Sequence, residues 1–368
     1  MDKQGDFFDD YTNDNSALKV NDGVKQPPVI NPYLKGRPLR RPSIKSVDEY
    51  MEGILAGDRT ILSQAITLVE SLSPEHRKTA SEIIARCQKE TAKKATMRIG
   101  ITGVPGVGKS TFIEAFGSHI TSAGHKLAVL AIDPSSERSK GSIQGDTTRM
   151  EILVRDPKAF IRPSPSAGSL GGVARRTRET ILLCEAAGYD VTFIETVGVG
   201  QSETAVHSMS DFFLLLMLSG AGDELQGIKR GIMEMSDLIA ITKADGSNVE
   251  KAKVARGLYA SALHLFPPTE SGWVPTAVTS SAVTKEGLDT IMDKINEYFT
   301  LVRGNGYYRR KRAQQARYWM YESINDALKN RFYEDETIER LLPAYEQDVL
   351  SGKLDSFAAA EELIARYK

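Results

Sequence analysis

The chain has 368 residues, of which 41% are hydrophobic and 26% are charged, and its net charge is −1 because 47 Lys and Arg nearly balance 48 Asp and Glu. This is the composition of a globular protein with one large domain or two smaller ones, and it gives no general attraction to nucleic acid or to an anionic membrane. No run reaches the roughly 18 apolar residues of a membrane-spanning helix, and the acidic first residues lack the apolar core of a signal peptide. Cys87 and Cys184 lie in apolar helical patterns, so we expect buried thiols and a cytoplasmic location.

The first 95 residues are predicted to form two parts. Residues 1–44 are polar and repeatedly interrupted by proline, which predicts a disordered or extended arm. The arm carries a basic cluster that is either a partner contact or simply solvated: Arg37, Arg40 and Arg41. From Ser46 onward apolar residues recur at helical spacing, and Ser73-Pro74 has the pattern of a helix start, so residues 45–95 are predicted to be a small helical module.

Residues 96–303 alternate apolar runs with helical segments, which predicts an α/β fold with a mostly parallel sheet flanked by helices. The expected strands cover residues 97–102, 127–133, 160–162, 191–196, 212–218, 238–242 and 274–279. Ligands of such sheets bind beyond the carboxyl ends of the strands. The polar residues that end these runs therefore mark where a site should lie.

Between the first expected strand and a predicted helix, the chain matches the phosphate-binding pattern G-x-x-x-x-G-K-[ST] without a mismatch. The matching residues are Gly103, Val104, Pro105, Gly106, Val107, Gly108, Lys109, Ser110 and Thr111. Glycines let the backbone turn its N–H groups toward phosphate oxygens, and the helix N-terminus adds partial positive charge. We expect Lys109 to bind the β- and γ-phosphates of a nucleotide and Ser110 to place its hydroxyl on Mg²⁺. The sequence thus predicts a P-loop NTPase.

Three carboxylates at or after strand ends are candidates for the magnesium shell or for orienting the attacking water. Glu195 closes an apolar run in the place of a Walker B acid, and Gly198 follows where a backbone N–H can sense the γ-phosphate. Asp133 ends the strand that is expected over residues 127–133, and Asp146 lies in the sequence GDTTR. Asp133 and Asp146 also fit ordinary turn or N-cap positions.

A guanine-reading pattern follows in Thr242-Lys243-Ala244-Asp245, which resembles N-K-x-D with Thr in place of the common Asn. Asp245 would accept hydrogen bonds from N1 and N2 of guanine, and Lys243 would cover the face of the base. The later segment Ser280-Ser281-Ala282 matches a backbone contact to guanine O6. Two base-reading segments in this order favour GTP over ATP.

The glycine-rich stretch 164–172 precedes a helix that is expected over residues 173–184, and a second such stretch, 219–227, follows the strand expected over 212–218. Both stretches are either ordinary connections or switches, and the mixture of charges and glycines favours a switch for the second. Residues 304–368 are predicted to be helical, with a long helix from Tyr308 and shorter helices separated by Pro343 and Gly352. The apolar residues of this region would pack on the same chain or form a dimer interface.

Five ordered segments resemble the MeaB/ArgK-type GTPases of the SIMIBI class, which are chaperones of adenosylcobalamin-dependent acyl-CoA mutases, chiefly methylmalonyl-CoA mutase. The segments are GVPGVGKST, AIDPSSERSKGSIQGDTTRM, FIRPSPSAGSLGGVARRTRET, ETVGVGQSETAV and GAGDELQGIKRG. The resemblance covers residues 46–368. It implies a homodimer that uses residues 304–368 as its dimerisation region. It also implies slow GTP hydrolysis, stimulated by the mutase, that gates cobalamin loading and protects or reactivates the mutase.

The resemblance also implies roles for individual residues. Lys109 and Ser110 take the phosphate and magnesium roles, and the stretch 220–229 takes the role of a partner-sensing third switch. The metal and switch carboxylates would be Asp133, Asp146 and Glu195, and the guanine residues Lys243 and Asp245. Val199 stands where Ras-like enzymes place the water-orienting Gln, which is consistent with slow hydrolysis in the absence of a partner.

Two other functions remain open at this point. A kinase of the amino-acid-transport type would need an acceptor pocket with a base beside it, and the sequence offers no dedicated residue for either. A GTP-dependent metal-insertion protein would need a cluster of Cys and His. The histidines are instead dispersed along the chain: His76, His119, His125, His207 and His264.

Overall fold

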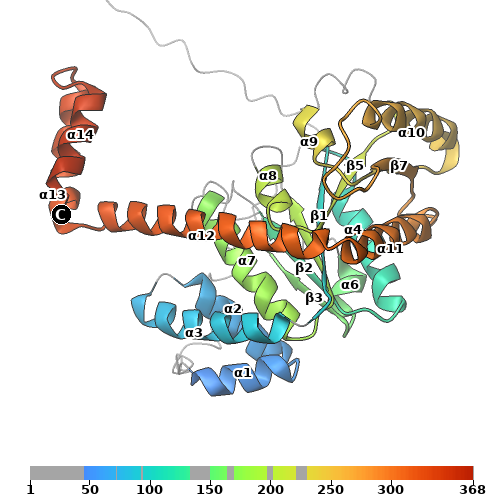
Figure 1. Cartoon of the computed structure of the whole chain (residues 1–368), viewed down its shortest axis with the longest axis horizontal. Helices are drawn as coiled ribbons and strands as arrows, with labels where there is room; N and C mark the ends of the chain where they lie inside the picture. Colours follow the sequence, from blue (N-terminus) through green and yellow to red (C-terminus); the bar gives the residue numbers. More distant parts are fainter. Residues whose placement is uncertain are drawn as a thin grey trace, which may run out of the picture. The chain divides into compact units, whose positions relative to one another are not determined.

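The computed structural model describes residues 45–71, 73–92, 94–132, 150–163, 170–196, 202–220 and 230–367. These residues belong to one compact unit, Lys45–Lys368. Its centre is a sheet of seven parallel strands in the order β3-β2-β4-β1-β5-β6-β7 (Figure 1). The predicted α/β class with a parallel sheet is confirmed.

Each of the expected strands is present, with small shifts at the ends. The strands are β1 (Met97–Gly103), β2 (Leu127–Ile132), β3 (Ala159–Arg162), β4 (Val191–Thr196), β5 (Phe212–Met217), β6 (Leu238–Ile241) and β7 (Thr276–Thr279). The central strands are buried along their whole length. Parallel strands covered on both faces need apolar side chains on both, which is why these segments are continuous apolar runs in the sequence.

Helices cover both faces of the sheet (Figure 1). They are α1 (Val47–Leu55), α2 (Arg59–Glu70), α3 (Pro74–Thr91), α4 (Lys109–Ser122), α6 (Glu151–Arg155), α7 (Leu170–Ala186), α8 (Ser202–His207), α9 (Arg230–Glu234), α10 (Val249–Leu263), α11 (Leu288–Gly304), α12 (Tyr307–Tyr333), α13 (Glu336–Leu350) and α14 (Ser356–Arg366). A short 3₁₀ helix, η2 (Gly246–Asn248), precedes α10. None of the helices within the described ranges is long and apolar enough to cross a membrane.

The side chains of β2 show how the core divides between the two faces. Ala128 and Leu130 join a core that α1, α2, α3 and α7 cover, whereas Leu127 and Val129 join a core that α4 and α11 cover. A strand points successive side chains to opposite faces, so one apolar run serves both cores. The helices of the N-terminal module therefore pack on the sheet through α7, with which α2 and α3 are in contact.

The start of α1 agrees with the helical pattern predicted from Ser46. The Ser46 hydroxyl accepts a hydrogen bond from the N–H of Glu49 at 3.2 Å, and the Glu49 carboxylate accepts one from the N–H of Ser46 at 2.7 Å. This reciprocal capping box satisfies backbone donors that the first helical turn leaves without partners.

Two sequence expectations about helix ends are wrong. The stretch 164–172 was expected to precede the helix, but Leu170, Gly171 and Gly172 already belong to α7. Pro343 was expected to separate two helices, but it lies inside α13. A proline inside a helix removes one backbone hydrogen bond. The helix nevertheless continues through Pro343, and α13 packs against α14. Gly352, by contrast, does follow the end of α13, with a φ of +72°.

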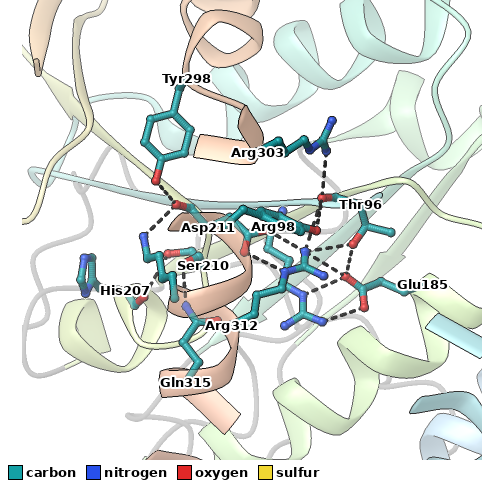
Figure 2. Close-up of polar contacts among 12 residues, drawn as sticks. Thr96, Arg98, Glu185, His207, Ser210, Asp211, Tyr298, Arg303, Arg312 and Gln315 are labelled. Atoms are coloured by element: carbon teal, nitrogen blue, oxygen red, sulfur yellow. Dashed lines mark hydrogen bonds and ion pairs between the residues drawn. The ribbon is translucent and has the colours of Figure 1, made fainter. Parts of the chain in front are cut away.

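The first turns of α12 are fastened to the segment between α8 and β5 by side chains at positions i, i+4 and i+8. Lys311 Nζ donates to the Asp211 carbonyl at 2.7 Å, and Gln315 Nε2 donates to the Ser210 carbonyl at 2.8 Å (Figure 2). Trp319 Nε1 donates to the carbonyl of residue 208 at 3.3 Å. One face of α12 thus donates hydrogen bonds to the backbone carbonyls of the segment 208–211.

Candidate functional site

The phosphate loop connects the end of β1 to the start of α4. A Cβ atom on Gly103 would lie only 2.7 Å from the carbonyl oxygen of Leu216 in β5, so glycine is required for the close approach of the two strands. Gly106 and Gly108 have φ values of +76° and +84°, and Gly108 is the N-cap of α4 without a side-chain capping bond. The loop therefore has the backbone conformation in which N–H groups at a helix start can bind an anion.

Lys109 and Ser110 are the first two residues of α4, and both are half-buried. Lys109 Nζ lies 3.4 Å from the carbonyl oxygen of Gly103 at the other end of the loop. The ammonium therefore lies across the loop. This position is the one that a phosphate-binding role requires. That role remains a prediction.

The remaining residues of the loop differ in exposure. Val107 is buried, Val104 is half-buried, and Pro105 and Thr111 are exposed. The buried Val107 packs in the hydrophobic core that α4 and α11 cover, and this contact anchors the loop to that core.

The segment 242–245 contacts the phosphate loop directly. The Thr242 hydroxyl donates to the carbonyl oxygen of Val107 at 3.0 Å, and Lys243 Nζ donates to the carbonyl oxygen of Gly106 at 2.9 Å. Thr242 is buried, and Lys243 has a left-handed backbone with a φ of +55°. Threonine in the place of the common Asn thus still connects the predicted base-reading segment to the predicted phosphate site.

Asp245 is oriented by the second predicted base-reading segment. The Ser281 hydroxyl donates to Asp245 Oδ2 at 2.5 Å, and Ser281 is fully buried. Ser281 Oγ also accepts hydrogen bonds from the N–H groups of Val283 and Thr284, at 3.2 and 3.1 Å. Within the described part of the chain, Asp245 Oδ1 has no hydrogen-bond partner. This carboxylate is therefore held at one oxygen and can accept a ligand at the other.

The backbone brings the two segments together at the carboxyl ends of β6 and β7. Ser280 N–H donates to the Ile241 carbonyl at 2.8 Å, and Ala244 N–H donates to the Ser280 carbonyl at 3.1 Å. The Ser280 hydroxyl is buried without a hydrogen-bond partner among the described residues, and Ala282 is half-buried. Residues 242–245 and 280–282 thus lie side by side and are joined by backbone hydrogen bonds.

Of the three carboxylates predicted for the magnesium shell, only Glu195 lies within the described residues. It is buried in β4, which continues through Thr196, one residue beyond it, and it is in register with Ile101 of β1. Beside it, the Thr196 and Thr102 hydroxyls lie 3.0 Å apart. Glu195 is therefore carried by the strand next to the one that leads into the phosphate loop. Asp133, Asp146 and Gly198 lie outside the described residues, as do residues 164–169 and 221–229 of the glycine-rich stretches.

Two predicted magnesium ligands, Ser110 and Glu195, lie within the described residues. Within the described ranges, no three His, Cys, Asp or Glu residues gather in a way that could hold a metal ion by themselves. Magnesium in nucleotide sites is typically bound by one or two protein oxygens together with phosphate and water. The hydroxyl of Ser110 and the carboxylate of Glu195 are oxygen ligands of this kind.

Sequence reasoning missed one contact of this site, made by Asn248 at the start of α10. Its side-chain amide bridges the carbonyl of Lys243 and the hydroxyl of Ser219. The available signal was an Asn three residues after the predicted guanine aspartate. That signal is weak, because Asn is also a common N-cap residue.

Comparisons with known proteins show which proteins this chain is similar to. The family model described as "Methylmalonyl Co-A mutase-associated GTPase MeaB" matches residues 62–337. A "Putative GTPase" of Caulobacter vibrioides is 48% identical over 321 residues, covering 87% of this chain and 98% of the relative. The "Methylmalonic aciduria type A homolog, mitochondrial" of Mus musculus is 43% identical over 359 residues, covering 95% of this chain and 86% of the relative. The crystal structure of an LAO/AO transport system kinase has a TM-score of 0.67 at 37% identity, covering 87% of this chain and 96% of that one.

Proposed function

Because the chain belongs to the MeaB family of GTPases, we propose that it is a chaperone of an adenosylcobalamin-dependent acyl-CoA mutase, with methylmalonyl-CoA mutase as the partner. Its activity is the hydrolysis of GTP to GDP and phosphate. In this proposal the nucleotide state gates the loading of cobalamin onto the mutase and protects or reactivates the mutase. The family description, which names methylmalonyl-CoA mutase, and the name of the mouse relative support this partner.

One observation carries the nucleotide-dependent part of the proposal: Thr242 and Lys243 bond to carbonyls of the phosphate loop. A nucleotide whose phosphates lie on that loop would therefore have its base beside residues 242–245. Asp245, held by Ser281, would accept hydrogen bonds from guanine N1–H and N2–H. Adenine has no such pair of donors on that edge, so the arrangement favours GTP.

The remaining predicted roles belong to the phosphate end of the nucleotide. Lys109 would bind the β- and γ-phosphates, and the described oxygen ligands for Mg²⁺ would be Ser110 and Glu195, with Asp133 and Asp146 as further candidates. Mg²⁺, when bound, neutralises negative charge that develops on the phosphates. Since Val199 occupies the position of a water-orienting Gln, we propose that the mutase partner supplies or orders the group that positions the attacking water.

We also propose that the chain forms a homodimer through its C-terminal helices. On α12, Tyr321, Ile324 and Leu328 lie at i, i+3 and i+7, so they share one helical face, and each is about half exposed. On α14, Phe357 is 79% and Ile364 63% exposed. Large apolar side chains gathered on one face are typical of a protein interface. A second copy of the chain would cover both faces.

The experiment that tests the function measures phosphate release from GTP with and without purified methylmalonyl-CoA mutase, together with co-elution in the GDP state and with a non-hydrolysable GTP analogue. We expect a several-fold increase in kcat and co-elution in at least one nucleotide state. Lys109→Ala is the control, and it should lose turnover in both conditions. Normal GTP hydrolysis with neither stimulation nor co-elution would exclude the chaperone function and leave the GTPase activity intact.

A further inference from the structure

The side chain of Asn248 forms two hydrogen bonds with separate loops at the carboxyl edge of the sheet. Its Nδ2 donates to the carbonyl oxygen of Lys243 at 2.7 Å. Its Oδ1 accepts a hydrogen bond from the Ser219 hydroxyl at 2.6 Å. A carbonyl can only accept, so the Lys243 contact fixes which end of the amide is the nitrogen. Asn248 therefore links the predicted guanine segment to the residues that follow β5.

Asn248 also lies at the N-cap position of α10, where an Asn side chain usually accepts a hydrogen bond from the second or third N–H of the helix. No such bond is present: the N-cap of α10 has no side-chain hydrogen bond. Each end of the amide instead forms one bond elsewhere. The helix thus forgoes a common source of stability in favour of the loop contacts.

These contacts hold a disfavoured backbone in place. Lys243 has a φ of +55°, a left-handed conformation that residues with a Cβ atom rarely adopt. Its carbonyl is held by Asn248 and its ammonium by Gly106. Because Lys243 directly precedes Ala244 and Asp245, its backbone conformation decides where the Asp245 carboxylate lies.

We propose that Asn248 is a positioning residue for recognition of the guanine base. It holds Lys243 in the left-handed conformation and so places Asp245, while Ser219 fixes the orientation of the amide. The result is a continuous chain of contacts from Ser219 through Asn248 and Lys243 to Gly106 of the phosphate loop. This inference rests on the proposed guanine role of Lys243 and Asp245.

The test measures GDP and IDP affinity of the full chain by titration calorimetry, together with thermal unfolding. For Asn248→Ala we expect a GDP Kd about tenfold higher, which corresponds to loss of roughly one well-placed hydrogen bond. IDP lacks the 2-amino group that Asp245 would bind, so its Kd should rise less and the preference for GDP over IDP should shrink. Ser247→Ala, at the exposed neighbouring position, is the matched control and should bind both nucleotides as the parent does.

A second variant and a second background keep the test decisive. Ser in Asn248→Ser can cap α10 but is too short to bridge the two loops, so this variant should reproduce the weaker GDP binding without loss of thermal stability. In a Lys243→Gly background the effect of Asn248→Ala should largely disappear, because glycine adopts a positive φ freely. An unchanged GDP Kd for both Asn248 variants, or an undiminished effect in the Lys243→Gly background, would overturn the inference. Asp245→Ala separates the two proposals: if it binds GDP as the parent does, the guanine assignment itself fails.

Discussion

Arg312 of α12 and Asp211, the residue before β5, form a bidentate ion pair: Nε donates to Oδ1 at 2.9 Å and Nη2 donates to Oδ2 at 2.7 Å. The same Nη2 donates to the Thr96 hydroxyl at 2.9 Å (Figure 2). Burial alone would raise the pKa of Asp211, but the neighbouring Arg312 and Arg98 hold that pKa below its usual value. Residues 96 and 211 directly precede the parallel strands β1 and β5. The ion pair therefore joins α12 to the amino-terminal ends of these strands, whereas the phosphate loop follows the carboxyl end of β1.

Arg312→Ala is expected to destabilise the fold strongly. It would leave Asp211 buried and deprived of its main partner, and removal of one member of a buried pair typically costs about 3–5 kcal/mol. Arg309→Ala, at an exposed position of the same helix, should change stability by less than about 0.5 kcal/mol. Urea denaturation of both variants measures the difference. Equal stability of the two variants would contradict the anchoring role of the pair.

His207 should contribute a loss of stability in mildly acidic solution. Burial first, and then the charge of Lys311, lower the pKa of His207 to about 4, whereas an unfolded histidine titrates at about 6.5. Between these values the unfolded chain binds a proton that the folded chain does not, so the free energy of unfolding falls as the pH drops, by up to about 3 kcal/mol. Burial raises the pKa of Asp237 to about 6, and that effect has the opposite sign.

His207→Phe isolates the histidine effect, because Asp237 is present in both proteins and cancels in the comparison. The variant keeps an aromatic ring to pack edge-on against Phe213, whose ring centroid lies 5.4 Å away. Urea denaturation at pH 7.5 and at pH 5 should show a smaller loss of stability for the variant than for the parent. Identical losses would exclude His207 as the source.

Asp245→Asn is expected to shift the base preference from GTP toward XTP. Xanthine carries a carbonyl where guanine has its 2-amino group, so an amide donor suits it better than a carboxylate. GTP affinity should fall by at least about tenfold, because a hydrogen bond to a charged group is lost. Competition binding with GTP and XTP measures the preference. Retained GTP affinity would remove Asp245 from the base site.

Thr242→Val tests the contact between the guanine segment and the phosphate loop. The change keeps the shape of the side chain but removes the hydroxyl that donates to Val107, leaving a buried carbonyl with one partner fewer. We expect GDP to bind about fivefold to tenfold more weakly. Thr242→Ser retains the hydroxyl and should stay within about twofold of the parent. If Thr242→Val binds GDP as tightly as Thr242→Ser does, the hydroxyl bond to Val107 is not needed for nucleotide binding.

The dimer proposal predicts that charge on the exposed face of α12 separates the subunits. Ile324→Glu combined with Leu328→Glu would place two carboxylates in the proposed interface, where buried unpaired charge is costly. Light scattering after size-exclusion chromatography should give the mass of a dimer for the parent and of a monomer for this variant. Asn330→Glu, at an exposed polar position on the opposite side of the same helix, should leave the dimer intact. A monomeric parent would refute the proposal.

The strands and the phosphate loop could be predicted because their signals are local. β4 and β5 are apolar throughout, since both faces of a parallel sheet are covered, and the phosphate loop needs glycines at fixed spacing. The family model confirms the resemblance to MeaB/ArgK-type GTPases that these motifs carried. The roles of Asp133, Asp146 and Gly198 remain predictions, because these residues lie outside the described ranges.

The long-range contacts could not be predicted, because their partners are far apart in the sequence. Arg98 is a charge inside an otherwise apolar strand, and its bidentate partner Glu185 lies in the last turn of α7 (Figure 2). Asn248 had the local pattern of an ordinary helix cap and proved to bridge two loops. In both cases the residue type was visible and its partner was not, since only the tertiary fold brings the two together.

The bonds from Lys311, Gln315 and Trp319 have a consequence for sequence variation. Every acceptor is a main-chain carbonyl of residues 208–211, so the side chains of residues 208 and 210 take no part in these bonds. The two sides of this contact are therefore under unequal constraint. These three bonds require that the backbone of residues 208–211 keeps its path, whereas each donor on α12 can be replaced only by another side chain that reaches the same oxygen. The three bonds by themselves therefore restrict the side chains of α12 and not those of residues 208 and 210.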